Sequence, residues 1–512
     1  MTFTSPLASA SPGEQKNPES LSAPLTHAQE SLYFLQQLTQ GEPVYNMPQA
    51  FRLRGSLNVA ALEGALRLLL SRHEALRSNI IESATGPTQV VRSDEELCFR
   101  IHDLKTVPTP DREGALQHLL EGAIREPFDL NGGVVCRADL FEVSGDDHAL
   151  LLNIHHIVGD MASLGIIFSE LSESYEALCK GRAPSLAPNV VQLRSFAAER
   201  RKNEASPELI GFWRENLAGF TSELDLPLDR FRPKMPTFKG AAYYFDLPSE
   251  LRNQLGELAR KSRSSLYMLC LSALEALLYR YTGQERFAIA TPFTEREDPR
   301  LEHTIGYLIN LLPIPCEVRA EQNFRELLAA VRAKCLAIYT HHDVSFRRII
   351  SELGLSTEHP KPPLARVVFQ YFPESASLEL SQLRCEPIRV HTQTSKFDLC
   401  LSMAEHGGTI TTEIEFDTDI YNESTVRRIA CHFQNLLSAI AANPDQEIGA
   451  LNLIDPEERD LLGKWNDTSR PYPREKSVHL LFEEEAERHP QAIALSFEGR
   501  KISYEVLNRE AN

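Results

Sequence analysis

Residues 134–160 read VVCRADLFEVSGDDHALLLNIHHIVGD, and the fold class can be argued outward from this stretch. Two apolar runs, Val134 to Val143 and His148 to Ile154, flank the turn-forming residues SGDD, which predicts a pair of joined strands. A helical pattern of apolar residues follows from Ser163 to about Leu178. The stretch therefore predicts an α/β lobe in which a buried strand ends directly at a pair of histidines.

Helices and strands alternate on both sides of this stretch, as the spacing of apolar residues indicates. The predicted helices cover Leu57 to Leu70, Arg112 to Arg125, Pro248 to Lys261, Ser264 to Tyr281, Phe324 to Thr340 and Thr425 to Asn443. The predicted strands lie near Gln89 to Val91 and at Arg286 to Thr291, Ala365 to Tyr371 and Ile410 to Phe416. Two α/β halves of similar size predict a two-lobed body from about residue 25 to residue 455.

The composition is that of a soluble globular protein with a large core. The chain has 512 residues, of which 42% are hydrophobic and 24% charged. The 53 Lys and Arg against 71 Asp and Glu give a net charge of −18, which argues against binding nucleic acid or anionic lipid. The most apolar stretch, Leu266 to Tyr281, contains Ser272, Glu275 and Arg280, so it predicts a buried helix and no membrane span.

The cysteines and the N-terminal residues indicate a cytoplasmic protein. Nine cysteines are scattered without any CxxC pair, and their number is odd. This pattern fits reduced thiols better than a disulfide framework or a zinc site. The first twenty residues are polar and lack the apolar segment of a secretory signal.

Changes in composition along the chain predict five segments. Residues 1–23 are rich in Ser, Pro, Glu and Lys and predict a flexible arm. The two lobes are expected at 24–200 and 201–455. Residues 456–475 hold turn formers and prolines and predict a linker, and residues 476–512 predict a second domain that has begun and is cut off.

His155, His156 and Asp160 form the pattern HHxxxD where the strand passes into a loop. Acyl transfer to an amine needs a group that holds or deprotonates the amine, and histidine can do either near neutral pH. The same three residues could also form a structural turn. A metal site is disfavoured, because adjacent residues of an extended segment point apart and no further ligands stand at familiar spacing. The sequence has no Gly-rich phosphate loop and no GxSxG element.

Several ordered motifs give the stretch from about 24 to 455 a resemblance to the condensation domain of nonribosomal peptide synthetases. The HHxxxD pattern matches the active-site motif of that family. The other matching motifs are Leu25 to Gln29 with Leu32 to Leu35, Arg72 to Arg77, Ile305 to Asn310 and His341 to Phe346.

The resemblance implies a two-lobed fold of the chloramphenicol-acetyltransferase type, a pseudo-dimer with a central tunnel. It implies peptide bond formation between a donor and an acceptor, each brought as a thioester by a peptidyl carrier protein on 4'-phosphopantetheine. His156 would position or deprotonate the amine, and His155 would be packed inward. Asp160 is expected to pair with Arg77, and Asn310 to support the second lobe. The resemblance requires no metal and no directly bound cofactor.

The residues after 455 resemble the region that joins a condensation domain to an adenylation domain. Trp465 to Thr468 and Tyr472-Pro473 are similar to the usual linker, and His479 to Glu483 and Ile502 to Asn508 look like the start of an adenylation domain. An adjoining adenylation domain is therefore an expected partner. Two related domain types are alternatives to the condensation domain. An epimerisation domain usually precedes a condensation domain and not an adenylation domain. A heterocyclisation domain should replace the histidine pair with aspartate, so His155 and His156 argue against it.

Met161 is the main departure from the family pattern, which usually has glycine after the aspartate. We expect Met161, with Gly159 and Ser163, to line the substrate channel and Met161 to select the donor. The alternative is that methionine fills a gap in the lobe core. Two other functions stay open: an inactive platform that docks carrier proteins, and a variant that also modifies an unusual donor, such as a polyketide-type chain or a dehydrated residue.

Overall fold

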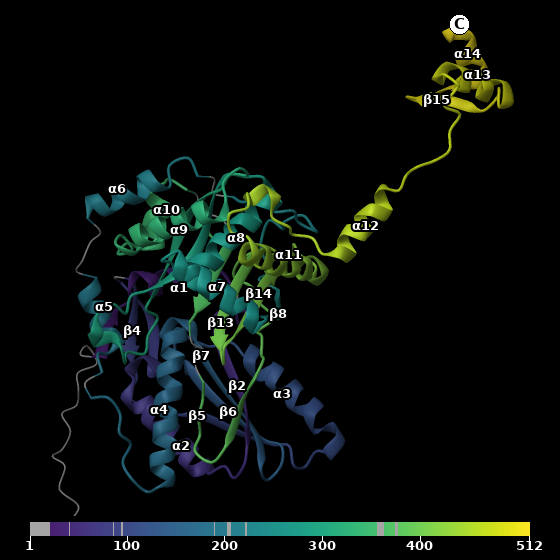
Figure 1. Cartoon of the computed structure of the whole chain (residues 1–512). Helices are drawn as coiled ribbons and strands as arrows, with labels where there is room; N and C mark the ends of the chain where they lie inside the picture. Colours follow the sequence, from purple (N-terminus) through teal and green to yellow (C-terminus); the bar gives the residue numbers. More distant parts are fainter. Residues whose placement is uncertain are drawn as a thin grey trace, which may run out of the picture. The chain divides into compact units, whose positions relative to one another are not determined.

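The computed structural model describes residues 21–39, 41–84, 86–93, 96–188, 190–201, 206–220, 223–355, 363–373 and 377–512. The chain divides into two compact units, Met1–Leu453 and Ile454–Asn512 (Figure 1). Most of the predicted arm, residues 1–20, lies outside the described residues. Strand β1 (Ser22–Pro24) pairs with β4 (Gly86–Val91), so the first lobe already includes residues before the expected boundary at residue 24.

The first lobe is built on a five-stranded sheet in the order β12-β2-β7-β6-β5. Its strands are β2 (Asn46–Arg54), β5 (Cys98–Asp103), β6 (Cys136–Glu142), β7 (Asp147–His155) and β12 (Arg384–Ile388). Helices α2 (Val59–Arg72) and α4 (Met161–Cys179) pack on one face, and α3 (Arg112–Arg125) covers the other. The strand that ends at the histidine pair is therefore central and buried on both faces. A smaller sheet joins β1, β4 and β3 (Ser78–Ser83).

The two lobes are not contiguous in the sequence. Strand β12 comes from the second half of the chain but pairs antiparallel with β2 at the edge of the first lobe's sheet. Here Cys385 lies opposite Leu53. The expected division into 24–200 and 201–455 is therefore wrong for this strand. An apolar pattern indicates a strand but carries no information on its partner strand, which explains the error.

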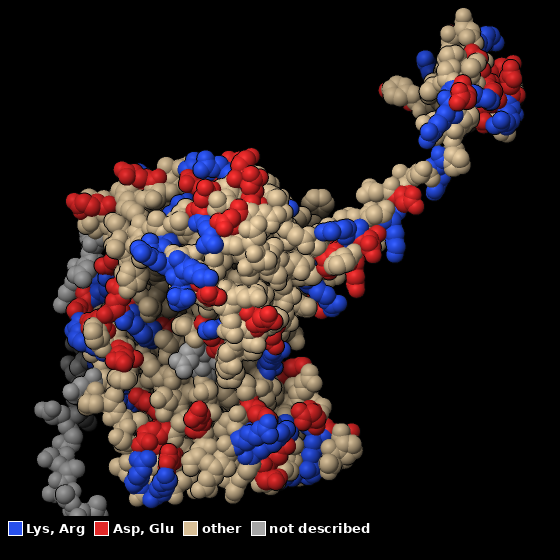
Figure 2. All heavy atoms as spheres, viewed as in Figure 1, with Lys and Arg blue, Asp and Glu red and all other residues tan. Residues whose placement is uncertain are grey.

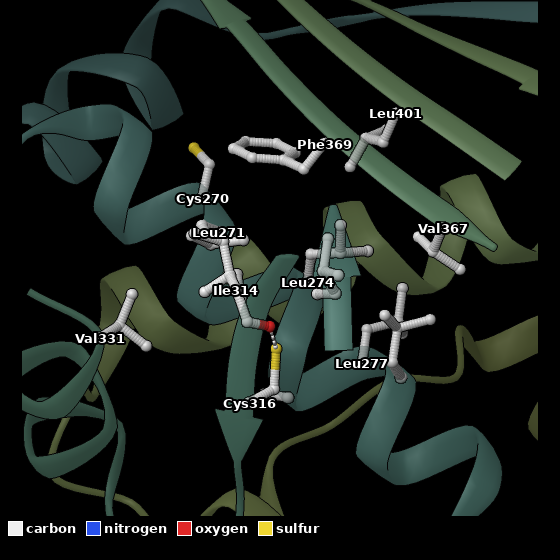
Figure 3. Close-up of a cluster of buried hydrophobic side chains, with 14 of the residues drawn as sticks. Cys270, Leu271, Leu274, Leu277, Ile314, Cys316, Val331, Val367, Phe369 and Leu401 are labelled. Carbon is white, nitrogen blue, oxygen red and sulfur yellow. Dashed lines mark hydrogen bonds between the residues drawn. The ribbon is translucent and has the colours of Figure 1, made fainter. Parts of the chain in front are cut away.

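The second lobe is built on a six-stranded sheet in the order β10-β9-β11-β13-β14-β8. Its strands are β8 (Gly240–Leu247), β9 (Arg286–Thr294), β10 (Ile309–Glu317), β11 (Val367–Phe372), β13 (Leu399–His406) and β14 (Thr409–Asp417). Helices α7 (Ser249–Lys261), α8 (Leu266–Thr282), α9 (Phe324–Tyr339) and α11 (Glu423–Ala442) cover one face. Figure 3 shows this core, where Phe369 from the sheet lies beside Cys270 and Leu271 of α8, and Leu401 lies on the other side of Phe369, toward Leu274.

Helix α8 shows why the longest apolar stretch folds as a core helix. The Ser265 hydroxyl accepts a hydrogen bond from the Met268 N–H and caps the first turn. Gly283 ends the helix with a φ of +69°, a left-handed conformation that glycine adopts without steric cost. Among the described residues, no helix has the length and apolar character that a membrane crossing requires.

The remaining elements of the first unit connect the lobes or lie at their margins. They are α1 (His27–Leu38), α5 (Leu193–Arg200), α6 (Pro207–Asn216) and α10 (Phe346–Glu352). Figure 2 shows acidic and basic side chains interspersed over both lobes, with Lys and Arg gathered near α1 in this view.

The second unit is small and contains two-stranded β-structure. It comprises α12 (Pro456–Asn466), α13 (Val478–Arg488), β15 (Ile493–Phe497), β16 (Arg500–Ser503) and α14 (Tyr504–Ala511). Its helix α12 covers the first half of the predicted linker, and none of its residues is buried. Strands β15 and β16 form an antiparallel pair.

Candidate active site

Strand β7 delivers the two histidines to the place where the lobes meet. His155 is the last residue of the strand and lies opposite Asn46 of β2. The His156 N–H donates to the Tyr45 carbonyl at 2.8 Å, and a single turn of 3₁₀ helix follows over His156–Val158. The ring of His156 then meets Tyr307, on the connection between β9 and β10, edge-on, with centroids 5.0 Å apart.

His155 is directed into the first lobe and is 1% exposed. Its Nδ1 accepts a hydrogen bond from the Ile157 N–H at 3.1 Å, and its Nε2 lies 3.3 Å from Gln36 Oε1. Burial, followed by the nearby His156 and Lys396, lowers the pKa of His155 to about 3. A neutral ring with both nitrogens occupied by the protein fits the inward packing that the sequence interpretation expects.

His156 is half-buried and keeps one ring nitrogen for another partner. Its Nδ1 lies 2.8 Å from the Gly159 carbonyl oxygen, which can only accept, so Nδ1 carries the proton. Nε2 of the neutral ring is therefore a hydrogen-bond acceptor. Burial first, and the positive charge of Lys396 second, lower the pKa of His156 to about 4. The ring is neutral at neutral pH and is suited to accepting a proton or a hydrogen bond.

Asp160 is 1% exposed, and both of its carboxylate oxygens are bound by the protein. Oδ1 accepts from the N–H and the hydroxyl of Ser163, each at 2.8 Å, and thereby caps α4. Oδ2 accepts from Arg296 Nη1 at 2.5 Å and from the Leu308 N–H at 3.1 Å. Arg296 and Leu308 lie on the connection between β9 and β10, two strands of the second lobe's sheet, and Leu308 packs into the apolar cluster of the first lobe, so the aspartate ties the histidine loop to this connection.

The expected pair of Asp160 with Arg77 is wrong. Arg77 donates to two carbonyl oxygens of its own lobe, those of Leu70 at 3.3 Å and Arg92 at 2.6 Å. Arg296, 136 residues from Asp160 in the chain, provides the charge instead. Arg77 is the last residue of a short helical turn, and main-chain carbonyl oxygens lie within its reach there. The sequence does not show that Arg77 binds these carbonyls.

Gly159 and Ser163 do not line a channel, in contrast to our expectation. Ser163 is 0% exposed, and its hydroxyl bonds to Asp160 and to the backbone of Gly306. Gly159 is also buried, and a Cβ there would stand 2.7 Å from Cδ1 of Ile154. Both residues therefore serve close packing between the loop, α4 and the second lobe.

Met161 is the first residue of α4 and is 37% exposed. This exposure excludes the alternative in which methionine fills a gap in the lobe core. The side chain starts directly after Asp160, at the loop that also carries His156. Its position is compatible with contact to a substrate.

Asn310 supports the second lobe next to a cavity of about 440 Å³. Its Nδ2 donates to the carbonyls of His342 and Val344 at 3.1 and 2.6 Å, and its Oδ1 accepts from the Phe346 N–H at 3.3 Å. These bonds hold the segment that leads into α10, as the sequence interpretation expects. The cavity is lined from the first lobe by α1 and Arg200 and from the second by Asn310 and α10.

Three residues of the site were missed by the sequence reasoning: Arg296, Tyr307 and Lys396. Tyr307 lies within the motif from Ile305 to Asn310, so its position was marked but its role was not. The Lys396 ammonium lies 5.8 Å from the ring centroid of Tyr45 and is close enough to lower the pKa of both histidines. No local pattern marks Arg296 or Lys396, because each reaches the site through the tertiary fold.

Within the part of the chain that the structure describes, no three His, Cys, Asp or Glu side chains come together as metal ligands. The nine cysteines are all free thiols. Three side-chain groups near the HHxxxD loop could act on a substrate: the neutral imidazole of His156, the phenol of Tyr307 and the amino group of Lys396.

Comparison with known families decides the classification. Residues 20–462 match the family model of the condensation domain. The chain belongs to this family. Condensation domains of nonribosomal peptide synthetases are acyltransferase-type enzymes that form amide bonds, which agrees with the activity expected from the HHxxxD motif.

Similar curated proteins are large synthetases. The chain is 37% identical over 499 residues to a linear gramicidin synthase of Brevibacillus parabrevis, covering 96% of this chain and 10% of that protein. It is 34% identical over 522 residues to a dimodular nonribosomal peptide synthase of Bacillus subtilis, covering 98% of this chain and 22% of the other. The chain thus spans about a tenth of the length of the first of these relatives.

Solved structures confirm the fold class. The X-domain from teicoplanin biosynthesis superposes with a TM-score of 0.74 at 27% identity and covers 84% of this chain and 97% of that chain. A four-domain nonribosomal peptide synthetase, holo-AB3403, superposes with a TM-score of 0.79 at 19% identity, covering 95% of this chain and 38% of the other. The two-lobed α/β architecture expected from the sequence is therefore confirmed, while the central tunnel remains a prediction.

Proposed function

We propose that this condensation domain transfers a donor acyl or peptidyl group from one carrier-protein thioester to the amine of an aminoacyl group on a second carrier. The amine nitrogen attacks the thioester carbonyl, a C–N bond forms and the C–S bond breaks. The proton lost by the amine is taken up by the departing sulfur. The observation that supports this proposal is the neutral His156, whose Nε2 is an acceptor at the junction of the lobes.

His156 acts mainly by holding the amine. A group with a pKa of about 4 binds a proton weakly at neutral pH, so it is a weak general base for the proton of the amine. As a hydrogen-bond acceptor it can still fix the lone pair of the neutral amine toward the carbonyl carbon. Positioning of this kind lowers the barrier by removing orientational freedom before the reaction.

Asp160 is a positioning residue, because its oxygens are bound by Ser163, Leu308 and Arg296 and are not available to a substrate. It fixes the loop from His156 to Met161 against the second lobe. Met161, exposed on that loop, would contact the acyl chain of the donor and influence which donors are accepted.

The cavity beside Asn310 supports the approach of one carrier between the lobes. Arg200, Arg347 and Arg348 line it, and arginine suits the phosphate of a phosphopantetheine arm. Arg200 also forms an ion pair with Asp343, which links the two lobes at the cavity wall. The arm would supply the thioester sulfur, and these arginines would hold its phosphate.

The second unit supports an adjoining adenylation domain as a further partner. The alignment to the dimodular synthase covers 98% of this chain, so it extends beyond residue 462, where the condensation match ends. The motifs from His479 to Glu483 and from Ile502 to Asn508 lie on α13 and across β16 and α14. Cytoplasmic location is part of the same proposal and fits the nine free thiols.

A transfer assay with both carriers loaded tests the proposed function. The donor carrier is charged with an acyl thioester and the acceptor carrier with an aminoacyl thioester, and the masses of both carriers are followed by mass spectrometry. We expect the acyl mass to move from the donor carrier to the acceptor carrier only when the domain is present. Binding of both carriers without any transfer would contradict the proposal and favour the docking platform.

A further inference from the structure

A row of polar side chains crosses the second lobe's sheet on the face opposite its helices. Gln370 of β11 lies opposite Ser402 of β13, Ser402 opposite Glu413 of β14, and Glu413 opposite Tyr244 of β8. We call these four residues the polar row. Four adjacent strands thus place one polar side chain each in a single line.

The polar row is not part of the hydrophobic core. Side chains alternate between the faces of a sheet, so Phe369, Leu401 and Ile414 point to the helices, and Figure 3 shows the first two there. The residues beside them in sequence must point the other way. All four members of the polar row are half-buried, and none belongs to the apolar cluster under the helices.

Hydrogen bonds between members of the polar row occupy the donors of Tyr244 and Gln370, but they leave two side-chain oxygens of the row without a donor. The Tyr244 hydroxyl donates to Glu413 Oε1 at 3.1 Å. Gln370 Nε2 donates to Ser402 Oγ at 3.2 Å and to Cys400 Sγ at 3.0 Å. Among the described residues, no group donates a hydrogen bond to Gln370 Oε1 or to Glu413 Oε2. The row therefore presents two oxygen acceptors in line.

Gln370 and Glu413 are both half-buried, and the hydration of Glu413 is reduced. Burial, with the neighbouring Glu415 as second cause, raises the pKa of Glu413, and burial beside Glu413 raises the pKa of Tyr244. A carboxyl oxygen that has lost part of its hydration without gaining a donor is unfavourable. A bound group with N–H or O–H donors would therefore be stabilised more here than at an exposed carboxylate.

The row is linked to the reaction centre through Glu415 and Lys396. One register step away, about 7 Å along the strands, Cys400 lies opposite Glu415. Glu415 is 3.4 Å from His391 and also accepts from the backbone N–H of Lys396. Lys396 is the residue whose charge acts on His156. The polar row and His156 thus have a common neighbour in the segment of Lys396, from which the side chain of a bound aminoacyl group would have to reach the row.

We propose that the polar row selects a substrate whose side chain donates hydrogen bonds, such as a carboxamide, a hydroxyl or an ammonium group. This inference rests on the proposed function, because it assigns a substrate class to the same site. The side chain would donate to Glu413 Oε2 or to Gln370 Oε1, which belong to strands two apart in the sheet, while Tyr244 holds the carboxyl group of Glu413 in place.

Glutamine and methionine have side chains of nearly the same shape, so their carrier-bound thioesters are compared as substrates. In one series the two amino acids are offered as the donor, and in a second series as the acceptor. We expect the chain to favour glutamine over methionine by about 100-fold or more in kcat/KM in one of the two series, since a site built for hydrogen bonds rejects an analogue without them. Glu413→Met should reduce this ratio at least tenfold, and Glu413→Gln should reduce it less. Affinity of the two aminoacyl-pantetheine amides, measured by calorimetry, should show the same order.

Glu405→Met is the matched control. Glu405 also accepts from a tyrosine, Tyr371 at 2.6 Å, on the same sheet, but on its helix side. This control should leave the ratio unchanged. An unchanged glutamine-to-methionine ratio in Glu413→Met, or a preference for methionine in the unmodified chain, overturns the polar row as a selector. Absence of transfer from all substrates, together with the expected calorimetric order, overturns the proposed function and leaves the selector standing.

Discussion

The end of strand β7 carries two adjacent histidines that lie in different surroundings, one facing the interior of the first lobe and one facing the junction of the lobes. On the side of the first lobe's interior, His155 is 1% exposed and both of its nitrogens face protein groups. On the side of the lobe junction, His156 uses Nδ1 for the Gly159 carbonyl and meets Tyr307 and the charge of Lys396. His155 is the last residue of β7 and His156 the first of the 3₁₀ turn, and this single step along the chain separates a packing residue from a candidate catalytic one.

The comparison also shows where each side obtains its support. The partners of His155 belong to the first lobe. The surroundings of His156 include residues from the second half of the chain: Tyr307, Lys396, and Arg296, which binds Asp160. We therefore expect substitutions on the interior side to change stability, and substitutions at the junction to change activity or the coupling of the lobes.

The largest expected effect is on the rate of transfer in His156→Ala. Loss of one positioning or proton-transfer group typically reduces a rate by about 10²–10⁴-fold. The melting temperature should stay close to that of the unmodified chain. His155→Ala should show the reverse, with a clear loss of stability. Single-turnover product formation measures the first effect, and unchanged product from His156→Ala would refute the assignment.

The buried ion pair across the lobes should give the next largest effect. Arg296→Met leaves the Asp160 carboxylate without its charge partner, which costs about 3–5 kcal/mol in the free energy of unfolding. Asp160→Ala should lower stability and activity together. Arg77→Met is the matched control and should not affect Asp160. Urea unfolding measures the stability of all three variants. If Asp160→Ala lost activity but kept full stability, the aspartate would take part directly in the reaction.

The pH dependence of stability distinguishes the two histidines from exposed ones. Both have a folded-state pKa, about 3 for His155 and about 4 for His156, below the usual 6.5. The unfolded chain therefore binds more protons between these values, so stability is full above about pH 6.5 and falls as the pH drops toward 4. Each histidine contributes a slope of about 1.4 kcal/mol per pH unit. His155→Gln should remove one such slope, and an unchanged slope between pH 6 and 4.5 would contradict its burial.

The smallest expected effect is that of Met161→Gly. The side chain is 37% exposed, so its removal should change the melting temperature little. The rate ratio between two donors of different shape should change severalfold, because the methionine adds bulk beside the loop of His156. Transfer assays with a short and a branched acyl donor measure this ratio. A lower melting temperature with a constant donor ratio would end the selectivity proposal.

Much of the fold could be predicted from the sequence because local patterns carry it. The helix expected at Arg112 to Arg125 is observed at Arg112–Arg125, and the strand expected at His148 to Ile154 is observed at Asp147–His155. The pairing of β12 with the first lobe could not be predicted, because hydrogen bonds between strands depend on the path of the whole chain. The same limit explains the error at Arg77.

The sequence was enough to determine the family, the two-lobed α/β class and the positions of His155, His156 and Asp160, because these depend on short motifs and on the periodicity of apolar residues. Only the tertiary structure decided that Arg296 binds Asp160, that Lys396 lies near the histidines, and that Ser163 is enclosed. Arg296 and Lys396 lie 136 or more residues from the aspartate of the loop they support, and electrostatic and packing contacts depend on distance in space. Spacing along the chain carries that information only within one element.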